Sequence, residues 1–414
     1  MKIIYLHQYF NTPEMAGGTR SYEMGRRLVE YGYQVEMITS YRHEDSPAGK
    51  AGEWFETEEN GIRVHWLPVP YSNKMSYRKR IKAFIRFAWG AAMRAASIEG
   101  DVVFATSTPL TIALPAVYAA RKNKVPMVFE VRDLWPELPI AVGALKNPLL
   151  KIAARNLERF AYNNSKRIIA LSPGMKEGIV KTGYSASKVK IIPNSSDIAF
   201  FDVGSEPGEH LRKKYQWLRD RPLVVYTGTI GIINGVDYLA RLAGAVRKLD
   251  PEIRFVIIGE GQGEEKLIRE AKEHGVLDKN LFLIPKVSKE EIRYWLSAAE
   301  LATSVFIDLE EMWKNSANKF FDALASGTPI AINYGGWQKE IIEESGSGLV
   351  LDPHDVDAAA GLLVEKIRDE NWLGEAGRAA EKLARERFDR DKLAKQLETV
   401  LFEAIEGSAE QNIK

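Results

Sequence analysis

The feature of this sequence that most constrains its fold is a regular alternation of short apolar runs with longer segments of helical periodicity. Strands that alternate with helices form parallel sheets with helices on both faces. The alternation occurs in two successive series, so we predict an α/β protein with two doubly wound domains. The apolar runs of the two series are residues 3–6, 35–39, 102–105, 127–131 and 167–171, and then 224–228, 254–259, 281–284, 301–306 and 329–333.

The length of the chain agrees with two domains. Its 414 residues are long for a single core and suit two domains of about 200 residues each. A polar stretch with glycine and proline, residues 203–209, follows the first series and is typical of a linker. We therefore predict a first domain at residues 1–203, a second at 204–391, and a helical tail at 392–414.

The composition excludes several classes of protein. Lys and Arg number 57 and Asp and Glu 56, so the net charge of +1 gives no global attraction to nucleic acid. The chain has no cysteine, which excludes disulfides and cysteine zinc sites and agrees with a reducing cytoplasm. The first residues are expected to form a strand and not a signal peptide. No apolar stretch reaches the roughly 18 to 20 residues that cross a bilayer, so we expect a cytoplasmic protein that meets the membrane only at its inner face.

Residues 315–348 combine a short helix, a strand, a glycine turn and a second helix. Asn315 or Ser316 is expected to cap the first helix, and Gly327 to end it. Lys319 and Asp322 are neighbours at i, i+3 outside the apolar stripe of that helix. Such a pair suits a ligand with phosphates and hydroxyls, or else forms an ordinary surface ion pair. The apolar stripe consists of Ala317, Phe320, Phe321, Leu324 and Ala325.

Residues 322–332 have the sequence Asp322-Ala-Leu-Ala-Ser-Gly-Thr-Pro-Ile-Ala-Ile. This sequence resembles the donor-binding segment of retaining, family-4-type glycosyltransferases. The resemblance implies the GT-B fold, in which two Rossmann-like domains face each other across a cleft. It also implies that the tail at residues 392–414 packs back on the first domain. In that family the acid at Asp322 holds the ribose hydroxyls of a nucleotide-sugar. Lys319 is then left for the diphosphate of that donor.

A glycine pair follows the first predicted strand. Gly17 and Gly18 stand at a strand-to-helix junction, where backbone amides and the helix N-terminus can receive a phosphate. A tight turn explains such a pair equally simply. The resemblance favours the functional interpretation, because the glycine loop of the family faces the donor phosphates.

A second candidate segment in the first domain is Glu130–Glu137. Many relatives carry His-Asp-x-x-Pro here, and their histidine touches the donor sugar; this chain has Arg132 in its place. Asp133 and Glu137 are expected to face the cleft as carboxylates. Asp133 can accept a proton from the acceptor hydroxyl, or orient Arg132, and an Arg132–Asp133 pair that only holds the loop together is an equal alternative.

The second domain departs from the family in its phosphate-binding loop. Thr229 and Asn234 stand where many relatives carry an arginine and a lysine that grip the diphosphate. The loop with Lys286 and Val287 matches the one whose amides read the base. Of the two glutamates that the family pairs, Asp322 fills the second place while the first is occupied by Lys314.

Three further features of the second domain stay open or have a simple explanation. Either Glu310 or Glu311 is left as a substitute for the missing first glutamate. Gly335 and Gly336 are expected to let the donor sugar approach the backbone. Asp389 and Asp391 resemble a metal motif of another glycosyltransferase fold, but we assign them to helix capping, and no metal-ligand spacing occurs elsewhere.

Residues 72–98 contain seven basic and no acidic side chains. A cationic amphipathic helix can lie on anionic lipid or attract a diphosphate acceptor. The alternative is a helix packed on the first sheet with a solvated basic face. The predicted apolar stripe is Tyr77, Ile81, Phe84, Ile85, Ala88 and Ala92, with Phe87 and Trp89 outside it. The basic residues are Lys74, Arg78, Lys79, Arg80, Lys82, Arg86 and Arg94.

These observations predict a retaining, metal-independent glycosyltransferase without a cofactor. It would move a hexosyl or N-acetylhexosaminyl group from a nucleotide-sugar, most simply UDP-linked, to a glycan on polyprenyl diphosphate in surface polysaccharide assembly. The departing phosphate is expected to accept the proton of the acceptor. A nucleotide-sugar-binding scaffold without transfer activity and a sugar-nucleotide epimerase of the same fold are the alternatives.

Overall fold

The computed structural model describes residues 1–15, 17–42, 53–71, 75 and 77–412, apart from the side chains of residues 77, 78 and 409–412. Lys74 of the predicted basic segment and the side chain of Arg78 therefore lie outside the described residues. The chain divides into two compact units, residues 1–193 with 391–414, and residues 194–390. The division precedes the predicted linker because Asn194 already belongs to the second unit: its amide and side chain donate to Ser316, at 3.0 and 2.5 Å.

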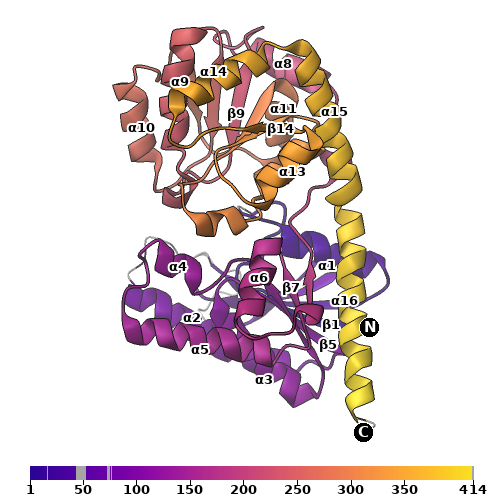
Figure 1. Cartoon of the computed structure of the whole chain (residues 1–414). Coiled ribbons are helices and arrows are strands. Elements are labelled where there is room, and N and C mark those ends of the chain that lie inside the picture. The colour runs from indigo at the N-terminus through magenta and orange to yellow at the C-terminus, as the bar shows by residue number, and fades with distance from the viewer. Residues whose placement is uncertain (16, 43–52, 72–74, 76, 413–414) are drawn as a thin grey trace. The chain divides into compact units, whose positions relative to one another are not determined.

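Unit 1 is built on an eight-stranded sheet with the order β3-β4-β2-β1-β5-β6-β7-β8 (Figure 1). All neighbouring strands are parallel except β3 and β4. Parallel strands with both faces covered require nearly continuous apolar sequence, which β1, β5 and β6 supply. The strands are β1 (Lys2–Leu6), β2 (Gln34–Tyr41), β3 (Phe55–Glu59), β4 (Ile62–Pro68), β5 (Val102–Thr106), β6 (Met127–Val131), β7 (Arg167–Ala170) and β8 (Val189–Ile191).

Helices cover both faces of this sheet. Ile3 and Tyr5 point into a core shared with α1 and α16, while Ile4 and Leu6 point into a core shared with α2, α3, α5 and α6. Successive residues of a strand face opposite sides, so β1 alone shows that the sheet is doubly wound. The helices are α1 (Arg20–Glu30), α2 (Tyr77–Ala96), α3 (Ala113–Asn123), α4 (Glu137–Ala141), α5 (Pro148–Asn163), α6 (Pro173–Lys181) and α16 (Arg390–Asn412).

The C-terminal helix α16 starts at the last residue of unit 2 and otherwise belongs to unit 1. Its apolar residues recur at helical spacing and join the core on the α1 side of the first sheet. Tyr33 also donates a hydrogen bond of 2.6 Å to Glu398. The buried residues of α16 are Leu393, Ala394, Leu397, Val400, Leu401 and Ala404.

The buried face of α2 differs from the predicted stripe. Its core residues are Ala83, Phe87, Ala91 and Ala95, whereas the predicted stripe members Ile81 and Ile85 are exposed. Three of the four core residues are alanines, and α2 packs against α3. Small side chains let two helices approach closely, so the packing selects the alanine row over the row of larger side chains. The prediction was wrong because it assigned the larger residues to the core.

Unit 2 is built on a six-stranded parallel sheet with the order β11-β10-β9-β12-β13-β14. One face is covered by α9, α10 and α14, whose buried residues join Val224 and Tyr226 of the sheet in a single core. The strands are β9 (Leu223–Thr227), β10 (Arg254–Ile258), β11 (Leu281–Ile284), β12 (Leu301–Ser304), β13 (Ile330–Ile332) and β14 (Gly348–Val350).

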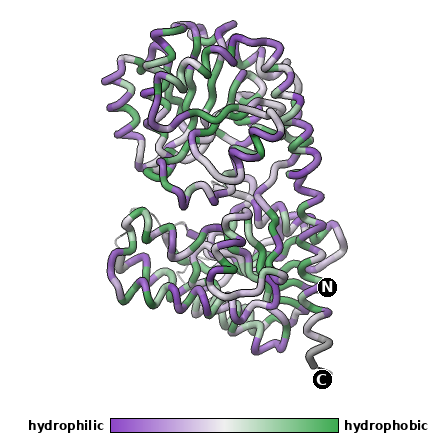
Figure 2. The backbone as a smooth tube through the Cα atoms, viewed as in Figure 1, coloured by the Kyte–Doolittle hydropathy of each residue, from purple (hydrophilic) through white to green (hydrophobic). Residues whose placement is uncertain are grey.

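The remaining helices of unit 2 pack on the sheet and on one another, α11 with α8 and α12 with α15. Figure 2 shows that hydrophobic residues gather in the strands of each unit, while the outer turns of the helices are hydrophilic. The helices are α7 (Ile198–Phe201), α8 (Glu206–Lys214), α9 (Asp237–Leu249), α10 (Glu264–Glu273), α11 (Lys289–Ala298), α12 (Asn318–Ala325), α13 (Trp337–Ser345), α14 (Val356–Ile367) and α15 (Glu370–Arg387).

The start of α12 also differs from its prediction. The helix begins at Asn318 without a side-chain cap. Asn315 instead accepts a hydrogen bond of 3.0 Å from the amide of Ala317, one turn too early, and Ser316 is used by Asn194. The predicted apolar stripe of α12 is confirmed for Phe320, Phe321, Leu324 and Ala325, which are buried, whereas Ala317 is half-buried and precedes the helix.

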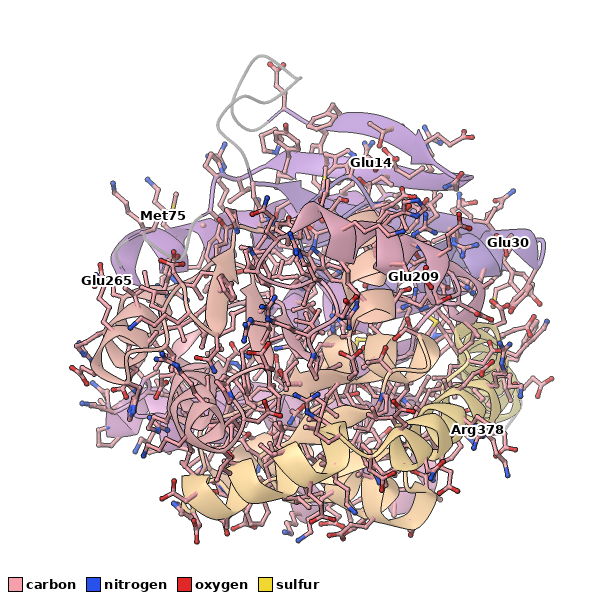
Figure 3. All side chains as sticks on the ribbon, turned by 90° about the horizontal axis from the view of Figure 1, so that it is seen from above. Glu14, Glu30, Met75, Glu209, Glu265 and Arg378 are labelled. Atoms are coloured by element: carbon pink, nitrogen blue, oxygen red, sulfur yellow. The ribbon has the colours of Figure 1, made fainter. Side chains whose placement is uncertain are left out.

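Charged side chains lie on the outside of both units. Glu30, Glu265 and Arg378 are exposed and point outward in Figure 3. Within the part of the chain that the structure describes, no helix is both long and apolar enough to cross a lipid bilayer.

Candidate functional site

The carboxyl edge of the second sheet collects most of the predicted donor-binding residues. The strand order reverses between β9 and β12, which pair through Tyr226 and Thr303. In open parallel sheets, ligands bind at the carboxyl ends of the strands beside such a reversal. Thr229 and Asn234 follow β9, Lys286 and Val287 follow β11, and Gly335 and Gly336 follow β13.

Lys319 of α12 lies at this reversal point. Its ammonium donates a hydrogen bond of 2.7 Å to the Tyr226 hydroxyl and lies 4.1 Å from the centre of that ring. A Cβ atom on Gly228 would lie 3.4 Å from the same nitrogen, and the φ of Gly228 is +131°. Burial lowers the pKa of Lys319 to about 7. Among the ion pairs of the described residues none involves Lys319, so this cation has no anionic partner in that part of the chain.

The loop after β9 is held in place by the loop after β10. Ile230 donates to Glu260 at 3.0 Å, and Gly263 donates to Ile230 at 2.8 Å. Gly259 and Gly261 are required here, because a Cβ at either position would lie 1.9 or 2.4 Å from a carbonyl oxygen of the β9 loop. The glycines of this second loop therefore serve the structure.

The side chains of Thr229 and Asn234 play different parts. Thr229 is exposed, and its carbonyl accepts a hydrogen bond of 2.8 Å from the Tyr226 hydroxyl. Asn234 ends a short 3-10 helix (Ile232–Asn234), and its side chain accepts a hydrogen bond of 3.2 Å from the Gly231 amide. Asn234 thus shapes the loop, while Thr229 stays accessible.

Asp322 is half-buried one turn after Lys319, but the two side chains have different partners. Asp322 accepts a hydrogen bond of 2.7 Å from the Ser196 hydroxyl. Burial raises the pKa of Asp322, while the nearby charges of Lys289 and Arg390 act in the opposite direction. The contacts therefore do not support the alternative, a simple surface ion pair between Lys319 and Asp322.

The glycines after β13 are not open to a ligand in the way that was expected. A Cβ on Gly335 would lie 3.2 Å from the Trp313 ring, and one on Gly336 would lie 2.6 Å from the Trp313 carbonyl. Trp313 lies in a 3-10 helix (Glu310–Lys314) and occupies the space that the prediction left for a sugar. Trp337 anchors the start of α13 by donating a hydrogen bond of 2.8 Å to the Asn315 carbonyl.

The other predicted residues of unit 2 are less constrained. Lys286 is exposed and Val287 half-buried, directly before Ser288, which caps α11. Glu310 is exposed and Glu311 half-buried, so their positions alone do not choose between them.

In unit 1 the strand order reverses between β1 and β5, and His7 follows β1 at that point. His7 is buried, and its Nε2 lies 3.4 Å from Nη1 of Arg132. Burial, together with the charges of Arg132 and Arg42, holds the pKa of His7 well below its usual value. The imidazole is therefore neutral. Its neighbour Gln8 is 1% exposed.

The glycine pair lies on the same side of unit 1. Gly17 and Gly18 are exposed before α1, and Asn11 donates a hydrogen bond of 3.2 Å to the Gly18 carbonyl. Gly17 has φ +133°, and a Cβ there would lie 2.6 Å from the Asn11 amide nitrogen. Both features require glycine, so the pair forms a tight turn whose backbone remains accessible.

The segment after β6 contributes Arg132 and Asp133. The amide of Arg132 donates to the Ser107 hydroxyl at 3.0 Å, which ties this segment to the end of β5. Asp133 is half-buried, and burial raises its pKa to about 6 against the opposing charge of Arg132. No ion pair between Arg132 and Asp133 occurs among the described residues, so the interpretation of this pair as a loop brace is not supported.

Glu137 does not face an open site. It is the first residue of α4, and its Oε2 is buried without a hydrogen-bond partner among the described residues. Its charge acts on Glu158 of α5, which is 3% exposed. Burial and Glu137 together raise the pKa of Glu158 to about 7. The expected cleft-facing role is corrected, because α4 turns this carboxylate onto α5.

A buried ion pair between Arg20 and Glu130 ties the start of α1 to β6. Arg20 donates to Glu130 at 2.8 and 3.0 Å and to the carbonyls of Ile192 and Pro193. Thr106 donates to the other oxygen of Glu130 at 2.6 Å. Every polar atom of this pair is satisfied, which favours a structural role.

The basic residues of α2 separate into two groups. Lys79, Lys82 and Arg86 are exposed. Arg80 is half-buried and lies 5.7 Å from the centre of the Tyr71 ring. Sequence reasoning missed the partners of the candidate charged residues, namely Tyr226 for Lys319, Ser196 for Asp322 and His7 for Arg132. The polar His7–Gln8 step directly after an apolar strand was the available signal in unit 1.

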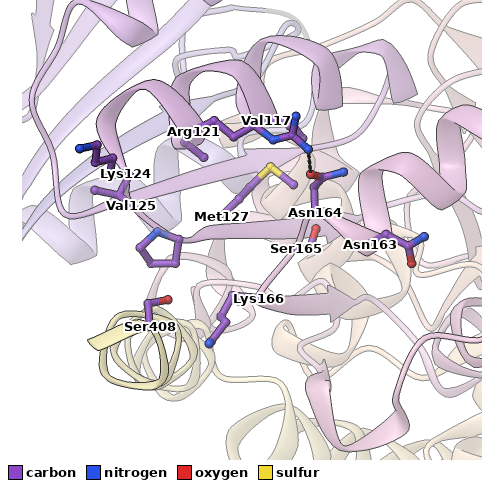
Figure 4. A pocket seen from close by; sticks show the side chains of 12 residues that line it. Val117, Arg121, Lys124, Val125, Met127, Asn163, Asn164, Ser165, Lys166 and Ser408 are labelled. Carbon is purple, nitrogen blue, oxygen red and sulfur yellow. Dashed lines mark hydrogen bonds between the residues drawn. The ribbon is translucent and has the colours of Figure 1, made fainter. Parts of the chain in front are cut away.

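Unit 1 also contains a cavity of about 360 Å³ that none of the predicted residues lines (Figure 4). It lies beside Met127 and Lys166, at the amino ends of β6 and β7, which is the sheet edge opposite to His7 and Arg132. Arg121 and Asn164 form a hydrogen bond of 2.7 Å in its wall. Across the described ranges, no group of three or more His, Cys, Asp or Glu side chains could hold a metal ion.

Comparisons with known proteins identify a family for each half of the chain. Residues 16–195 match the family of glycosyl transferase 4-like domains, and residues 208–386 match the glycosyl transferases group 1. A putative colanic acid biosynthesis glycosyl transferase, WcaI of Escherichia coli K12, is 25% identical over 66% of this chain and 69% of its own length.

Solved structures show the same fold at low identity. Sucrose-phosphate synthase of Thermosynechococcus elongatus superposes with a TM-score of 0.79 at 14% identity, over 98% of this chain and 99% of that one. HepE of Anabaena, solved with UDP-glucose, has a TM-score of 0.71 at 16% identity, over 97% and 100% of the two chains. With both domain types matched in order, the chain belongs to the group 1 glycosyltransferases of the GT-B fold, with a family-4-like N-terminal domain.

Proposed function

We propose that this glycosyltransferase is a retaining enzyme that moves a hexosyl or N-acetylhexosaminyl group from a UDP-linked donor to a glycan on polyprenyl diphosphate. The observation that carries the donor assignment is Lys319. Its ammonium lies at the reversal point of the second sheet against Tyr226 and Gly228, without an anionic partner among the described residues. A diphosphate placed there supplies the missing negative charge.

The other contacts of unit 2 fit the same ligand. Asp322 presents a half-buried carboxylate one helical turn from Lys319, where it would bind the ribose beside the diphosphate. Lys286 and Val287 stand at the end of β11, two strands away, where the base would lie. The HepE structure was solved with UDP-glucose, which supports a uridine donor, and the name of WcaI supports a role in polysaccharide assembly.

In unit 1, the proposed acceptor-side groups are Asp133 and Arg132. An acid whose pKa is about 6 is ionised at neutral pH and can orient the acceptor hydroxyl or accept its proton. In unit 2, Lys319 would stabilise the charge of the departing phosphate. We propose that this phosphate takes the proton and that the reaction needs no metal ion or cofactor. Turnover in excess EDTA equal to that in added Mg²⁺ would support this, and restoration only by Mg²⁺ would refute it.

The test of the function is transfer of label. The protein is incubated with a panel of UDP- and GDP-sugars, each radiolabelled in the sugar, and with membrane lipid from a polysaccharide-producing bacterium. Transfer from a UDP-sugar to extractable lipid is the expected result. Binding of the donor without labelled lipid would favour the scaffold alternative, and a changed sugar on the recovered nucleotide without any acceptor would favour an epimerase.

A binding experiment tests the site itself. Asp322→Ala should weaken UDP binding by about 1.5 to 3 kcal/mol, since charge-assisted hydrogen bonds to the ribose are lost. Asp357→Ala removes an exposed carboxylate of α14 and is the matched control. Calorimetric titration with UDP measures both, and equal affinities of the two variants would remove Asp322 from the site.

We also propose that unit 1 meets an anionic membrane through the outer face of α2, α3 and α5. In Figure 1 these helices lie in one layer, and α3 contacts both α2 and α5. Trp89 is 74% exposed and Leu149 75% exposed, in a patch that is larger than single scattered residues explain. The exposed apolar residues of the three helices are Ile81, Ile85, Trp89, Met93, Leu114, Tyr118, Leu149, Leu150 and Ile152.

Charge favours lipid as the occupant of this face. The three helices contain eleven Lys and Arg but a single acid, Glu158, and that acid is buried. Exposed apolar residues between basic ones suit the interface of an anionic bilayer. A second protein copy would have to place like charges against each other on this face.

The membrane proposal is tested by sedimentation with vesicles that contain phosphatidylglycerol. Replacing Lys79, Lys82 and Arg86 by Gln should release the protein at moderate salt, because each charge contributes about 1 kcal/mol near an anionic surface. The control replaces the exposed Lys181, Lys188 and Lys190 by Gln, with the same change in net charge. Equal release of both variants would contradict a specific face.

A further inference from the structure

Unit 1 gathers two arginines around a pair of tyrosines and a third arginine beside the neighbouring His7. The guanidinium of Arg42 lies 5.6 Å from the centre of the Tyr9 ring, and that of Arg80 lies 5.7 Å from the centre of the Tyr71 ring. The two rings are 5.3 Å apart. Arg42 follows β2 and Arg80 lies in α2, yet the two guanidiniums flank the same pair of aromatic rings.

Arg132 extends this group toward the end of β1. Its Nη1 lies 3.4 Å from His7, and both Arg132 and Arg42 act on the charge of that histidine. His7, Gln8 and Tyr9 are consecutive, so the three guanidiniums surround one short stretch of backbone. The imidazole is neutral, and it adds no fourth positive charge.

None of these arginines has a carboxylate partner among the described residues, whereas Arg20 and Arg27 of the same unit have buried ion pairs. The side chain of Arg42 donates to the neutral amide of Asn11. The Nε of Arg80 is buried and has no hydrogen-bond partner in the described part of the chain. Half-buried cations without a counter-charge are costly, and an anion from outside the protein removes that cost.

Polar groups without partners lie beside the arginines. Both amide atoms of Gln8 and the Nδ1 of His7 are buried and lack a hydrogen-bond partner among the described residues. Gln8 and the neutral His7 can each donate or accept. Buried polar groups in folded proteins almost always have a hydrogen-bond partner. Groups without a partner in the protein are therefore expected to bind a ligand or ordered water.

Guanidinium groups bind phosphates through paired hydrogen bonds, and they stay charged at every pH of interest. Phe84 of α2 stacks on Tyr71 at 5.6 Å, and Ile81 begins the exposed apolar row directly after Arg80. An anion at the arginines would thus carry its apolar part along α2. This combination fits a diphosphate with a hydrocarbon tail better than a free sugar or a free nucleotide.

We infer that Arg42, Arg80 and Arg132, with the Tyr9–Tyr71 pair, form a binding site for the diphosphate head of the acceptor lipid. The inference rests on the proposed function, because it names how the lipid-linked acceptor is recognised. It assigns Arg80 to the headgroup and leaves Lys79, Lys82 and Arg86 for the membrane surface.

The experiment measures binding and not turnover. Farnesyl diphosphate, a short soluble polyprenyl diphosphate, is titrated into the parent protein, into Arg42→Gln/Arg80→Gln, and into the control Lys188→Gln/Lys190→Gln. The control residues are exposed on or before β8 and remove the same charge. The parent and the control should bind equally, and the double variant should lose about tenfold for each arginine.

Three further arms separate the sources of the signal. Farnesol should bind the parent and the double variant alike, and inorganic pyrophosphate should show the same loss as farnesyl diphosphate. UDP should bind the double variant as it binds the parent. Equal farnesyl diphosphate affinity in the parent and the double variant overturns the inference. So does an equal loss for UDP, which would assign the arginines to the donor.

Failure of this inference and failure of the proposed function give different experimental results. If no label passes from a UDP-sugar to lipid while the double variant still loses farnesyl diphosphate, the site stands and the proposed reaction fails. Circular dichroism of each variant shows whether it is folded. If the double variant is unfolded, the single Arg80→Lys variant keeps the charge but loses the paired geometry, and it should bind less tightly than the parent; unchanged binding by a folded Arg80→Lys variant then overturns the inference.

Discussion

The two units are of similar size and share a doubly wound architecture, yet their surfaces and charges differ. Of the thirteen large hydrophobic side chains that are exposed among the described residues, eleven belong to unit 1 and two, Ile232 and Leu249, to unit 2. A shared fold does not determine a shared surface. Under the proposed function, unit 1 would bind an amphipathic partner and unit 2 a ligand that is soluble in water.

The charged groups at the two sheet edges differ in a second way. Unit 1 presents arginines, which remain protonated, and its groups that titrate near neutrality are the acids Asp133 and Glu158. Unit 2 presents Lys319, a cation whose pKa is about 7. A rise in pH therefore adds negative charge to unit 1 and removes positive charge from unit 2. The following changes test that contrast, from the largest expected effect to the smallest.

Replacing Glu158 by Gln should have the largest effect, on the stability of unit 1. The folded pKa of Glu158 is about 7, above its value in the unfolded chain, so the folded state holds more protons between about pH 4.5 and 7. Stability contributed by this group falls as the pH rises through that window, by on the order of 3 kcal/mol. Urea unfolding at pH 5 and pH 8 should show this loss in the parent and not in Glu158→Gln.

The control for this experiment is Glu403→Gln, an exposed carboxylate of the same unit. It should unfold with the same pH dependence as the parent. If Glu158→Gln also keeps the parent's dependence, another group is responsible, and Glu158 is not the titrating acid of unit 1.

The second effect is the pH dependence of UDP binding by unit 2. A bound diphosphate stabilises the protonated form of Lys319. Above the pKa of about 7 that Lys319 has without the ligand, binding of UDP is therefore accompanied by uptake of a proton. From pH 7 to 8.5 the affinity for UDP should fall about 16-fold, since half of Lys319 is already neutral at pH 7 and each further pH unit approaches a factor of ten. Lys319→Arg stays charged and should bind UDP with almost no pH dependence. Calorimetry in buffers of different ionisation enthalpy measures the number of protons taken up when UDP binds.

Uridine is the control ligand, because it lacks the phosphates that Lys319 is proposed to bind. Its affinity should change little over this pH range or on replacement of Lys319 by Ala. An equal loss for uridine and UDP would mean that Lys319 acts through the packing on Tyr226.

The third effect concerns Asp133 and the acid limb of the reaction. If Asp133 must be ionised, kcat/KM should fall about tenfold for each pH unit below its pKa of about 6. Lys319 produces the opposite limb above pH 7, so the full profile is a narrow bell. Asp133→Asn should lower the plateau and abolish the acid limb while the alkaline limb remains. An acid limb that persists in Asp133→Asn would assign it to another group.

The sequence was sufficient for five strands of each sheet and for the core of α12, because their apolar residues recur at strand or helix spacing, but it missed β3, β4, β8 and β14. It was insufficient for α2. That helix carries two apolar rows at i, i+4, one with Ile81, Ile85 and Trp89 and one with Ala83 and Phe87. Periodicity cannot rank two such rows, and size alone favours the wrong one. Close packing of α2 on α3 decides in favour of the alanines.

The candidate sites divide in the same way. Lys319 and Asp322 were found from a local motif, but Tyr226, the partner of Lys319, is 93 positions away. Gly335 and Gly336 look like an opening until Trp313 is placed against them. Arg42, Arg80 and Arg132 come from three separate elements. Arg42 and Arg80 meet at the Tyr9–Tyr71 pair and Arg132 lies beside His7, an arrangement that depends on strand order, which no local pattern contains.

The smallest expected effect is that of Trp89→Ser on stability. Trp89 is 74% exposed, and Trp and Ser have similar helix propensities. The free energy of unfolding should therefore change by less than about 0.5 kcal/mol. Phe87→Ala, two positions earlier on the buried face, should cost about 3 to 5 kcal/mol. Urea unfolding of the two variants at low protein concentration compares the faces directly. A comparable loss for Trp89→Ser would mean that the exposed row is packed against protein, in which case unit 1 would meet a protein partner through α2 and not a membrane.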